Sequence, residues 1–329
     1  MNWKDVFPKE NRYFETENGI LYNGDVLNAL KQFPDESVDC VITSPPYWGL
    51  RDYGVDGQIG LEETFYTYLE KLLEIFDEVY RVLKPSGTCW VNLGDTYGGS
   101  GSGTTKNVDI EKYKQNAKES YILPGGKAKS SKLRNTKYNK SLLMIPERFA
   151  IGMIEMGWVL RNKIVWHKPN AMPESVKDRF SKSYEFIYFF TKNKKYFFNQ
   201  IKEDISLSSK QRYKYKFDSP KYREADTKVK QEGLLSYKYH LLEHGKKNKR
   251  DVWNISTKPF KGAHFAVFPP DIPETCIKAG SNEGNVILDI FMGAGTTAVA
   301  CEKLNRRWIG IELNPEYCEI AKQRILGEI

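Results

Sequence analysis

Residues 38–48 read VDCVITSPPYW, an apolar run rich in β-branched residues that stops at two consecutive prolines. Proline cannot continue the hydrogen bonding of a central strand and cannot enter the interior of a helix. We therefore expect a strand over residues 38–42, followed by a rigid elbow at its carboxyl end. Because ligands of α/β sheets bind outside the carboxyl ends of the strands, this elbow is the first candidate binding site.

The elbow carries three groups that suit a planar base with an exocyclic amino group. Ser44 offers a hydroxyl, Pro45 a backbone carbonyl and Tyr47 an aromatic ring. The two oxygens can accept the two amino hydrogens, and the ring can stack on the face of the base. The alternative is a plain Pro-Pro turn with a buried tyrosine, which loses weight if a ligand-binding loop shares the same edge of the sheet.

Strands and helices alternate along the chain, which is the pattern of an α/β fold. The helix predicted over 62–83 has apolar residues at helical spacing and stops at Lys84-Pro85-Ser86-Gly87, a helix-breaking sequence. We expect strands at 19–22, 38–42, 88–93, 159–166, 184–190, 286–290 and 308–312, and helices at 26–33, 62–83, 142–157, 270–280, 296–304 and 315–326.

A glycine-containing loop, DIFMGAGTTA over residues 289–298, lies between a predicted strand and a predicted helix. Gly293 and Gly295 let the backbone approach a ligand at the helix N-terminus. Glu312, at the end of the next strand, is placed to accept hydrogen bonds from two ribose hydroxyls. The spacing fits NAD or S-adenosyl-L-methionine, and we favour the latter because a dinucleotide half needs a further βα unit after this one.

The position of the loop predicts a circularly permuted sheet. With the cofactor half last in the chain, the rest of the sheet must come from the N-terminal strands. The fold is thus expected to be a doubly wound, mainly parallel, Rossmann-like sheet. In it the elbow and the glycine loop share one edge, and residues 1–193 and 262–329 supply the two halves.

The positive charge is concentrated between the two halves. The formal net charge is +8, and residues 194–261 alone contain 18 Lys and Arg against 8 Asp and Glu. An excess of cations on one segment, interleaved with tyrosines, predicts contact with a polyanion. Residues 98–141 are rich in Gly, Ser and Lys and are predicted to form a mobile loop, either a solvated linker or a lid that contacts DNA.

Cysteine usage and hydropathy limit the class of protein. The five cysteines show no CxxC spacing, which predicts reduced core residues and no zinc or other metal site. The N-terminal residues lack an apolar targeting segment, and no apolar stretch approaches the length of a membrane span. We expect a cytoplasmic protein.

The order of these motifs resembles the amino-group DNA methyltransferases of the β arrangement, and the resemblance covers nearly the whole chain. The resemblance rests on Ser44-Pro45-Pro46-Tyr47, the FMGAGT loop at 291–296 and the basic segment between them. Gly24-Asp25, Asn92-Leu93-Gly94-Asp95, Trp166-His167-Lys168-Pro169-Asn170 and residues 264–269 (HFAVFP) resemble further family motifs.

The resemblance implies three groups of site residues and makes 194–261 the target-recognition segment. The catalytic group is Ser44, Pro45, Pro46, Tyr47 and, more weakly, Asp95, for which a turn or cofactor contact is the alternative. The cofactor-binding group is Asp25, Thr43, His264, Phe265, Phe268, Asp289, Phe291, Gly293, Gly295, Thr296, Thr297, Glu312, Leu313 and Asn314. The DNA-binding group is Trp48, Lys168, Lys214, Lys216, Lys246, Lys247, Lys249 and Arg250.

The first residue of the elbow separates the subclasses of the family. Members with Ser there tend to methylate cytosine N4, and members with Asp tend to methylate adenine N6. Ser44 therefore implies N4 methylation of a flipped cytosine in double-stranded DNA, with S-adenosyl-L-methionine as the cofactor. Adenine N6, an RNA substrate and a DNA-binding protein without catalysis remain alternatives. The partners implied are DNA and a cognate restriction endonuclease, and the protein acts as a monomer or homodimer.

Overall fold

The computed structural model describes residues 2–99, 133, 135–208, 211, 245–258 and 268–328, which belong to two compact units. The larger unit comprises Met1–Phe198 and Asp251–Ile329, and the smaller comprises Asn199–Arg250. Four residues predicted to bind cofactor or DNA lie outside the described residues, as does most of the loop predicted at 98–141. They are His264, Phe265, Lys214 and Lys216.

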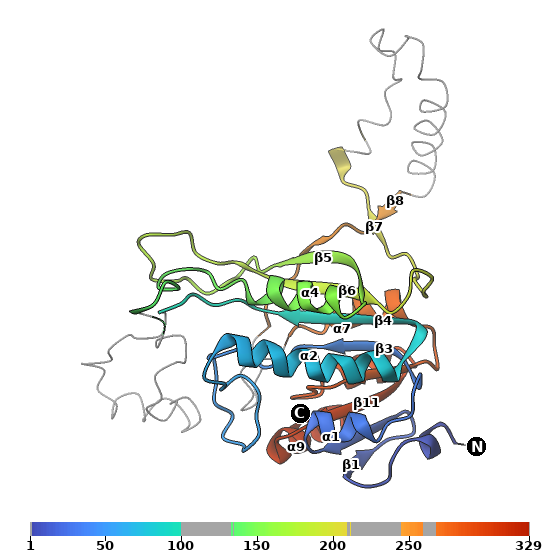
Figure 1. Cartoon of the computed structure of the whole chain (residues 1–329). Helices are drawn as coiled ribbons and strands as arrows, with labels where there is room; N and C mark the ends of the chain where they lie inside the picture. Colours follow the sequence, from blue (N-terminus) through green and yellow to red (C-terminus); the bar gives the residue numbers. More distant parts are fainter. Residues whose placement is uncertain are drawn as a thin grey trace. The chain divides into compact units, whose positions relative to one another are not determined.

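A nine-stranded sheet of order β1-β2-β11-β10-β3-β4-β6-β5-β9 organises the larger unit (Figure 1). Strands β2, β11, β10, β3 and β4 run parallel, whereas β1 and β6 are antiparallel to their neighbours. The strands are β1 (Arg12–Glu15), β2 (Gly19–Asn23), β3 (Val38–Thr43), β4 (Leu83–Leu93), β5 (Val159–His167), β6 (Tyr184–Thr191), β9 (Val252–Asn254), β10 (Val286–Asp289) and β11 (Arg307–Glu312).

Helices pack in two groups, as a doubly wound fold requires. One group places α2 against both α1 and α4, and these three helices lie together in Figure 1. The other group places α8 against both α7 and α9. The helices are α1 (Val26–Lys31), α2 (Phe65–Val82), α4 (Ile145–Glu155), α7 (Asp271–Gly280), α8 (Thr296–Lys303) and α9 (Pro315–Leu326), with a 3-10 turn η1 at Trp3–Val6. The predicted fold class is confirmed.

The sheet has the permuted order that the sequence predicts. Strand β10, from the C-terminal part of the chain, inserts between β11 and β3, with Ile287 paired to Cys40 and Leu288 to Val41. Because β10 and β3 are parallel, their carboxyl ends lie side by side. The elbow and the glycine loop therefore emerge next to each other.

Helix α2 ends where the sequence predicts, but the following strand starts earlier than expected. The side chain of Thr64 caps the helix by accepting a hydrogen bond from the Thr67 amide. The chain then enters β4 directly at Leu83, instead of first turning through residues 84–87. The register slips between the pairs Val38–Leu83 and Cys40–Thr88, and this irregularity accommodates Pro85, which has no amide hydrogen to donate.

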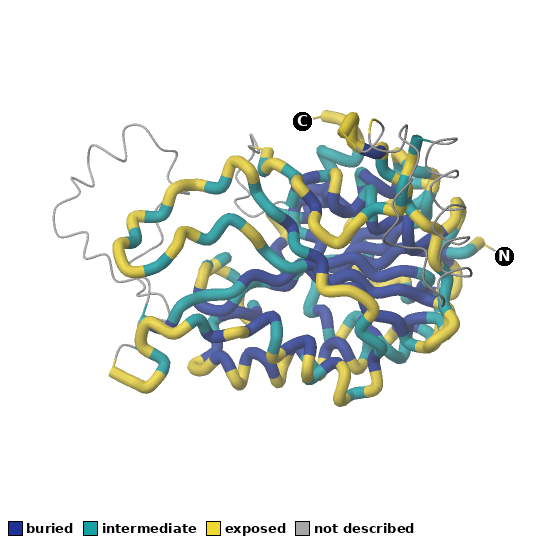
Figure 2. The backbone as a smooth tube through the Cα atoms, turned by 90° about the horizontal axis from the view of Figure 1, so that it is seen from above, coloured by how far each residue is buried: buried dark blue, intermediate teal, exposed yellow. Residues whose placement is uncertain are grey.

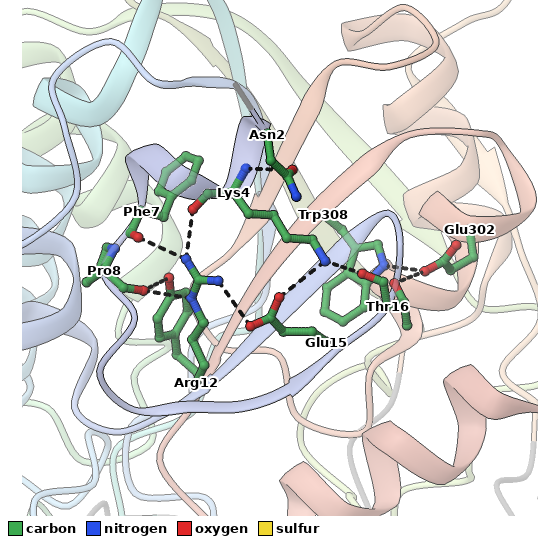
Figure 3. Close-up of polar contacts among 10 residues, drawn as sticks. Asn2, Lys4, Phe7, Pro8, Arg12, Glu15, Thr16, Glu302 and Trp308 are labelled. Carbon is green, nitrogen blue, oxygen red and sulfur yellow. Dashed lines mark hydrogen bonds and ion pairs between the residues drawn. The ribbon is translucent and has the colours of Figure 1, made fainter.

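The N-terminal segment is fixed to the sheet by polar contacts (Figure 3). Arg12 donates to the carbonyls of Lys4 at 2.7 Å and Phe7 at 2.9 Å, and its guanidinium pairs with Glu15 at 3.0 Å. From the C-terminal half, Glu302 of α8 accepts the hydroxyl of Thr16 at 2.6 Å and the indole hydrogen of Trp308 at 2.8 Å. These contacts anchor β1 and β2 beside β11.

The interior of the larger unit is formed by its central strands, as Figure 2 shows in dark blue. Every residue of β10 is buried, and β3 is buried at all but one position. All five cysteines are buried free thiols, as their spacing predicts, and burial raises the pKa of Cys40 to about 12. Among the described helices, none is long and apolar enough to cross a membrane.

The smaller unit contains a two-stranded antiparallel sheet of β7 (Lys202–Asp204) and β8 (Lys246–Asn248). Glu203 pairs with Lys247 at 3.2 Å and with Arg250 at 3.5 Å. Lys246 and Lys249 belong to the same unit. The DNA-binding role of these four cations remains a prediction.

Candidate functional site

A cavity of about 520 Å³ lies at the carboxyl edge of the parallel strands. Its lining joins residues that follow β3 with residues that follow β10 and β11, so both halves of the chain contribute to one site. Of the predicted residues, those in the lining are Asp25, Ser44, Pro45, Pro46, Tyr47, Lys168, Phe268, Phe291, Gly293, Thr296, Glu312, Leu313 and Asn314.

The elbow is held in place by helix α2 and by its own turn. Tyr68 of α2 donates its hydroxyl to the carbonyl of Pro46 at 2.7 Å. The amide of Gly49 donates to the carbonyl of Gly60 at 2.7 Å, and that of Leu50 donates to the carbonyl of Tyr47 at 3.3 Å. Ser44, Pro45 and Tyr47 thus line the cavity from a backbone that is fixed on both sides.

Tyr47 is tied into a buried polar network with residues of β4 and β6. Its hydroxyl lies 2.7 Å from Oε2 of Glu185 and 3.3 Å from Oδ1 of Asn92. Burial and the neighbouring Glu185 carboxylate raise the pKa of Tyr47 well above its ordinary value, so the phenol stays neutral. Asn92 Oδ1 also lies 3.5 Å from the hydroxyl oxygen of Ser44.

Trp48 corrects one prediction. We expected Trp48 to bind DNA, but the residue is only 2 % exposed. Its indole donates to the carbonyl of Glu62 at 3.1 Å and packs edge-on against Phe65. Trp48 is therefore a core residue that supports the elbow from behind, because the turn after Tyr47 directs it into the interior.

Asp95 corrects a second prediction. Its carboxylate accepts hydrogen bonds from the amides of Met144 at 3.0 Å and Ile145 at 3.1 Å. These are orphan donors at the start of α4, whose own N-cap side chain makes no capping bond. Asp95 is not in the cavity lining. Its carboxylate acts as a helix cap, which matches the turn alternative.

Three predicted cofactor ligands lie behind the glycine loop and not in the lining of the cavity. Asp289 is buried and accepts hydrogen bonds from Thr43 at 2.8 Å, Thr297 at 2.6 Å and the amide of Phe291 at 3.1 Å. Burial raises the pKa of Asp289 to about 6. Asp289, Thr43 and Thr297 therefore shape the loop, and their direct contact with the cofactor remains a prediction.

Gly295 is also structural, because it adopts φ +77° at the start of α8 and a Cβ there would lie 2.9 Å from the Cβ of Ala321. Only glycine combines the left-handed backbone with this close helix packing. Its role is to bring α8 against α9, and it does not line the cavity.

Glu312 is the acidic residue that faces the cavity from the end of β11. Its carboxylate accepts hydrogen bonds from the amides of Gly293 at 2.7 Å and Asn314 at 2.8 Å. Burial, with a contribution from the nearby Asp289 charge, raises the pKa of Glu312 to about 7. A carboxylate has about four lone-pair sites, so Glu312 keeps acceptor capacity for the hydroxyls of a bound sugar beside these amides.

The sequence reasoning missed Glu185 and Lys182, and it named Asn92 only as part of a family motif; all three residues line the cavity. Glu185 forms an ion pair with Lys168, whose ammonium lies 4.2 Å from the centre of the Trp166 ring. Lys168 is thus a cavity residue and already carries a carboxylate partner. The available signal for Glu185 was a single charged residue within the apolar strand sequence YEFIYFF at 184–190.

Comparison with known proteins places the chain in a family. Residues 38–323 match the N6/N4 methyltransferase family, described as DNA methylase. The chain belongs to this family. It is 41 % identical over 314 residues to the Type II methyltransferase M.Cfr9I of Citrobacter freundii, covering 95 % of this chain and 90 % of the relative. It is also 41 % identical over 303 residues to M.SmaI of Serratia marcescens, covering 92 % and 89 %.

Solved structures agree on the fold of this DNA methylase. The PvuII DNA methyltransferase (cytosine-N4-specific) superposes with a TM-score of 0.59 at 21 % identity, covering 96 % of this chain and 89 % of that chain. A putative DNA modification methylase from Thermus thermophilus, complexed with S-adenosyl-L-methionine, superposes with a TM-score of 0.55 at 22 % identity. The match covers 94 % of this chain and 93 % of that chain. The predicted family is confirmed.

Proposed function

We propose that this DNA methylase transfers a methyl group to the exocyclic N4 of a cytosine flipped out of duplex DNA. The observation that carries the proposal is the placement of Ser44, Pro45 and Tyr47 in the same cavity as Glu312 and Gly293. One part of the cavity suits a planar base, and the other suits a nucleoside cofactor. Ser44 at the head of the elbow favours cytosine over adenine within the family.

The cofactor side of the cavity fits S-adenosyl-L-methionine. The acceptor-only carboxylate of Glu312 suits the ribose hydroxyls, the ring of Phe291 offers an apolar surface, and Asp25 lines the cavity at the start of α1. Bound there, S-adenosyl-L-methionine supplies an electrophilic methyl group on a good leaving group. The protein therefore needs to orient the acceptor and has no need of a covalent nucleophile.

The base side can make the amino nitrogen reactive. That nitrogen is a poor nucleophile because its lone pair is delocalised into the ring. Hydrogen bonds from its two N–H groups to the Ser44 hydroxyl oxygen and the Pro45 carbonyl favour a tetrahedral nitrogen, whose lone pair then points toward the methyl group. Tyr47 stacks on the base, and the nitrogen gains a methyl group and loses a proton to water.

We propose a restriction-modification role, in which the methylated site is protected from a cognate endonuclease. The support is that the two 41 % identical relatives are Type II methyltransferases. Such an enzyme would act on chromosomal DNA in the cytoplasm, with the segment around 194–261 contacting the target. Lys246, Lys247, Lys249 and Arg250 are the described candidates for phosphate contacts.

Product analysis tests the proposal directly. The protein is incubated with mixed-sequence duplex DNA and S-adenosyl-L-methionine, and the DNA is digested to nucleosides for mass spectrometry. We expect N4-methylcytosine. N6-methyladenine would keep the family and cofactor but overturn the assignment based on Ser44. Methylation of RNA alone would overturn the DNA substrate.

A further inference from the structure

Glu185 stands out because it is an acidic residue on an otherwise uncharged strand and yet it lines the cavity. β6 runs from Tyr184 to Thr191, and its other residues are aromatic, apolar or uncharged. The side chain of Glu185 is 13 % exposed. Removing a carboxylate from water costs free energy unless the carboxylate is hydrogen-bonded and paired. The partners of Glu185 therefore indicate its role.

The partners of Glu185 are Tyr47 of the elbow, Asn92 and Lys168. Oε2 accepts the Tyr47 hydroxyl at 2.7 Å and lies 3.3 Å from the Asn92 side-chain nitrogen, while Oε1 pairs with Lys168. Asn92 also donates to the carbonyl of Phe186 at 3.0 Å. These two donor contacts turn the Asn92 oxygen toward Ser44, at 3.5 Å.

The ring of Tyr47 is confined from a second direction by Gly94. A Cβ at Gly94 would lie 2.4 Å from Cε2 of Tyr47, so the ring edge rests directly against the glycine backbone. The ring is thus held at its edge by Gly94 and at its hydroxyl by Glu185. An aromatic ring with both ends fixed can present one defined face to a base.

We propose that Glu185 is a positioning residue for methyl transfer, which orients Tyr47 directly and Ser44 through Asn92. Lys168 neutralises the carboxylate that this arrangement requires. This inference deepens the proposed function, because it assigns to a β6 residue the alignment of both base-contacting side chains. Glu185 makes none of its described contacts with the glycine loop, so cofactor binding should not depend on it.

The test compares E185Q with the wild type on a duplex whose target site has first been mapped with the wild-type enzyme. Glutamine keeps the shape, but one acceptor oxygen becomes an NH₂ group, which must face either Lys168 or the Tyr47–Asn92 pair. We expect kcat to fall about 10- to 100-fold, with the Kd for S-adenosyl-L-methionine and the KM for DNA within about twofold. E147Q is the matched control, because Glu147 also pairs with a lysine, Lys163 at 2.5 Å, but lies outside the cavity lining.

A double-mutant cycle with Y47F separates positioning from general destabilisation. If Glu185 acts through the Tyr47 hydroxyl, E185Q should cost much less in the Y47F background than in the wild type. Equal costs in both backgrounds, a kcat within threefold of the wild type, or a matching loss of cofactor affinity would overturn the proposal.

Crystal structures provide a readout that does not depend on activity. In E185Q the Tyr47 ring should change rotamer or lose defined density, and G94A should displace the same ring by steric contact. An unchanged, well-ordered Tyr47 in E185Q would refute the inference even if the wild type methylates DNA. A displaced Tyr47, with no methyl transfer by the wild type, would support the positioning role and overturn the proposed function alone.

Discussion

The buried carboxylate of Glu312 predicts a specific pH dependence of cofactor binding. Its pKa of about 7 in the free protein means that it is mostly ionised at pH 8 and mostly protonated at pH 6. In the proposed complex the ribose hydroxyls donate to the carboxylate, and a protonated carboxyl has lost one acceptor site to its own hydrogen. The cofactor should therefore bind the ionised form preferentially.

The magnitude follows from the ionised fraction. With a pKa of about 7, the ionised fraction falls from about nine-tenths at pH 8 to about one-tenth at pH 6, so the affinity should fall about tenfold, or about 1.4 kcal/mol. The stability of the folded protein depends on pH in the opposite direction. Because the pKa is raised in the folded state, the free protein gains stability from Glu312 at low pH and loses that stability as pH rises from about 4.5 through 7.

Isothermal titration of S-adenosyl-L-methionine at several pH values between 6 and 8 measures the effect. The α-amino group of the ligand also titrates in this range, so the decisive quantity is the ratio of wild-type Kd to that of E312Q. Since glutamine cannot ionise, we expect this ratio to change about tenfold, with the variant weaker at pH 8. E316Q, an exposed glutamate on α9, is the control and should follow the wild type. Parallel pH profiles for the wild type and E312Q would refute the assignment of Glu312 to the ribose.

Three substitutions test the corrected roles and the packing of the sheet. D95A should lower the free energy of unfolding by about 1–2 kcal/mol through the lost cap on α4, with kcat within threefold; a large kcat loss at unchanged thermal stability would restore a catalytic role. W48A should lower the free energy of unfolding by about 3–5 kcal/mol in denaturant titrations, while the DNA affinity of the folded protein stays unchanged. Weaker DNA binding without a loss of stability would contradict the burial of Trp48. G19A should lower the free energy of unfolding by about 1–3 kcal/mol or more, because the new Cβ would lie 1.8 Å from the Trp308 ring. A calorimetric unfolding midpoint equal to that of the wild type would disprove this contact.

The strands and loops of the site were predictable because their signals are local. A β-branched run that ends in two prolines and a strand followed by GxG each fix a turn within a few residues. The permuted order then followed from topology alone. Ser44, Tyr47, Gly293 and Glu312 all line the cavity as expected, since each lies at or just after the end of a parallel strand.

Side-chain direction was less predictable, because it depends on long-range partners. Trp48 and Asp95 lie next to correctly predicted positions, but a turn directs one into the core and the α4 amides occupy the other. The sequence placed the start of this helix at residue 142, and so it did not identify Met144, which has no capping side chain, as the N-cap of α4. Glu185 contacts Tyr47 across 138 residues, and no spacing rule relates such distant positions.

The hydrogen bond from the Thr43 hydroxyl to the Asp289 carboxylate explains how a permuted chain keeps the elbow and the glycine loop in register. The two residues are 246 positions apart, and the backbone pairing of β3 with β10 includes only Ile287–Cys40 and Leu288–Val41. The Thr43 hydroxyl extends that pairing to the ends of both strands, where the elbow and the glycine loop begin. Asp289 in turn accepts the amide of Phe291, so one buried carboxylate links the base side to the cofactor side. In-line transfer requires both reactants to be aligned, and this link makes their relative position a property of the sheet.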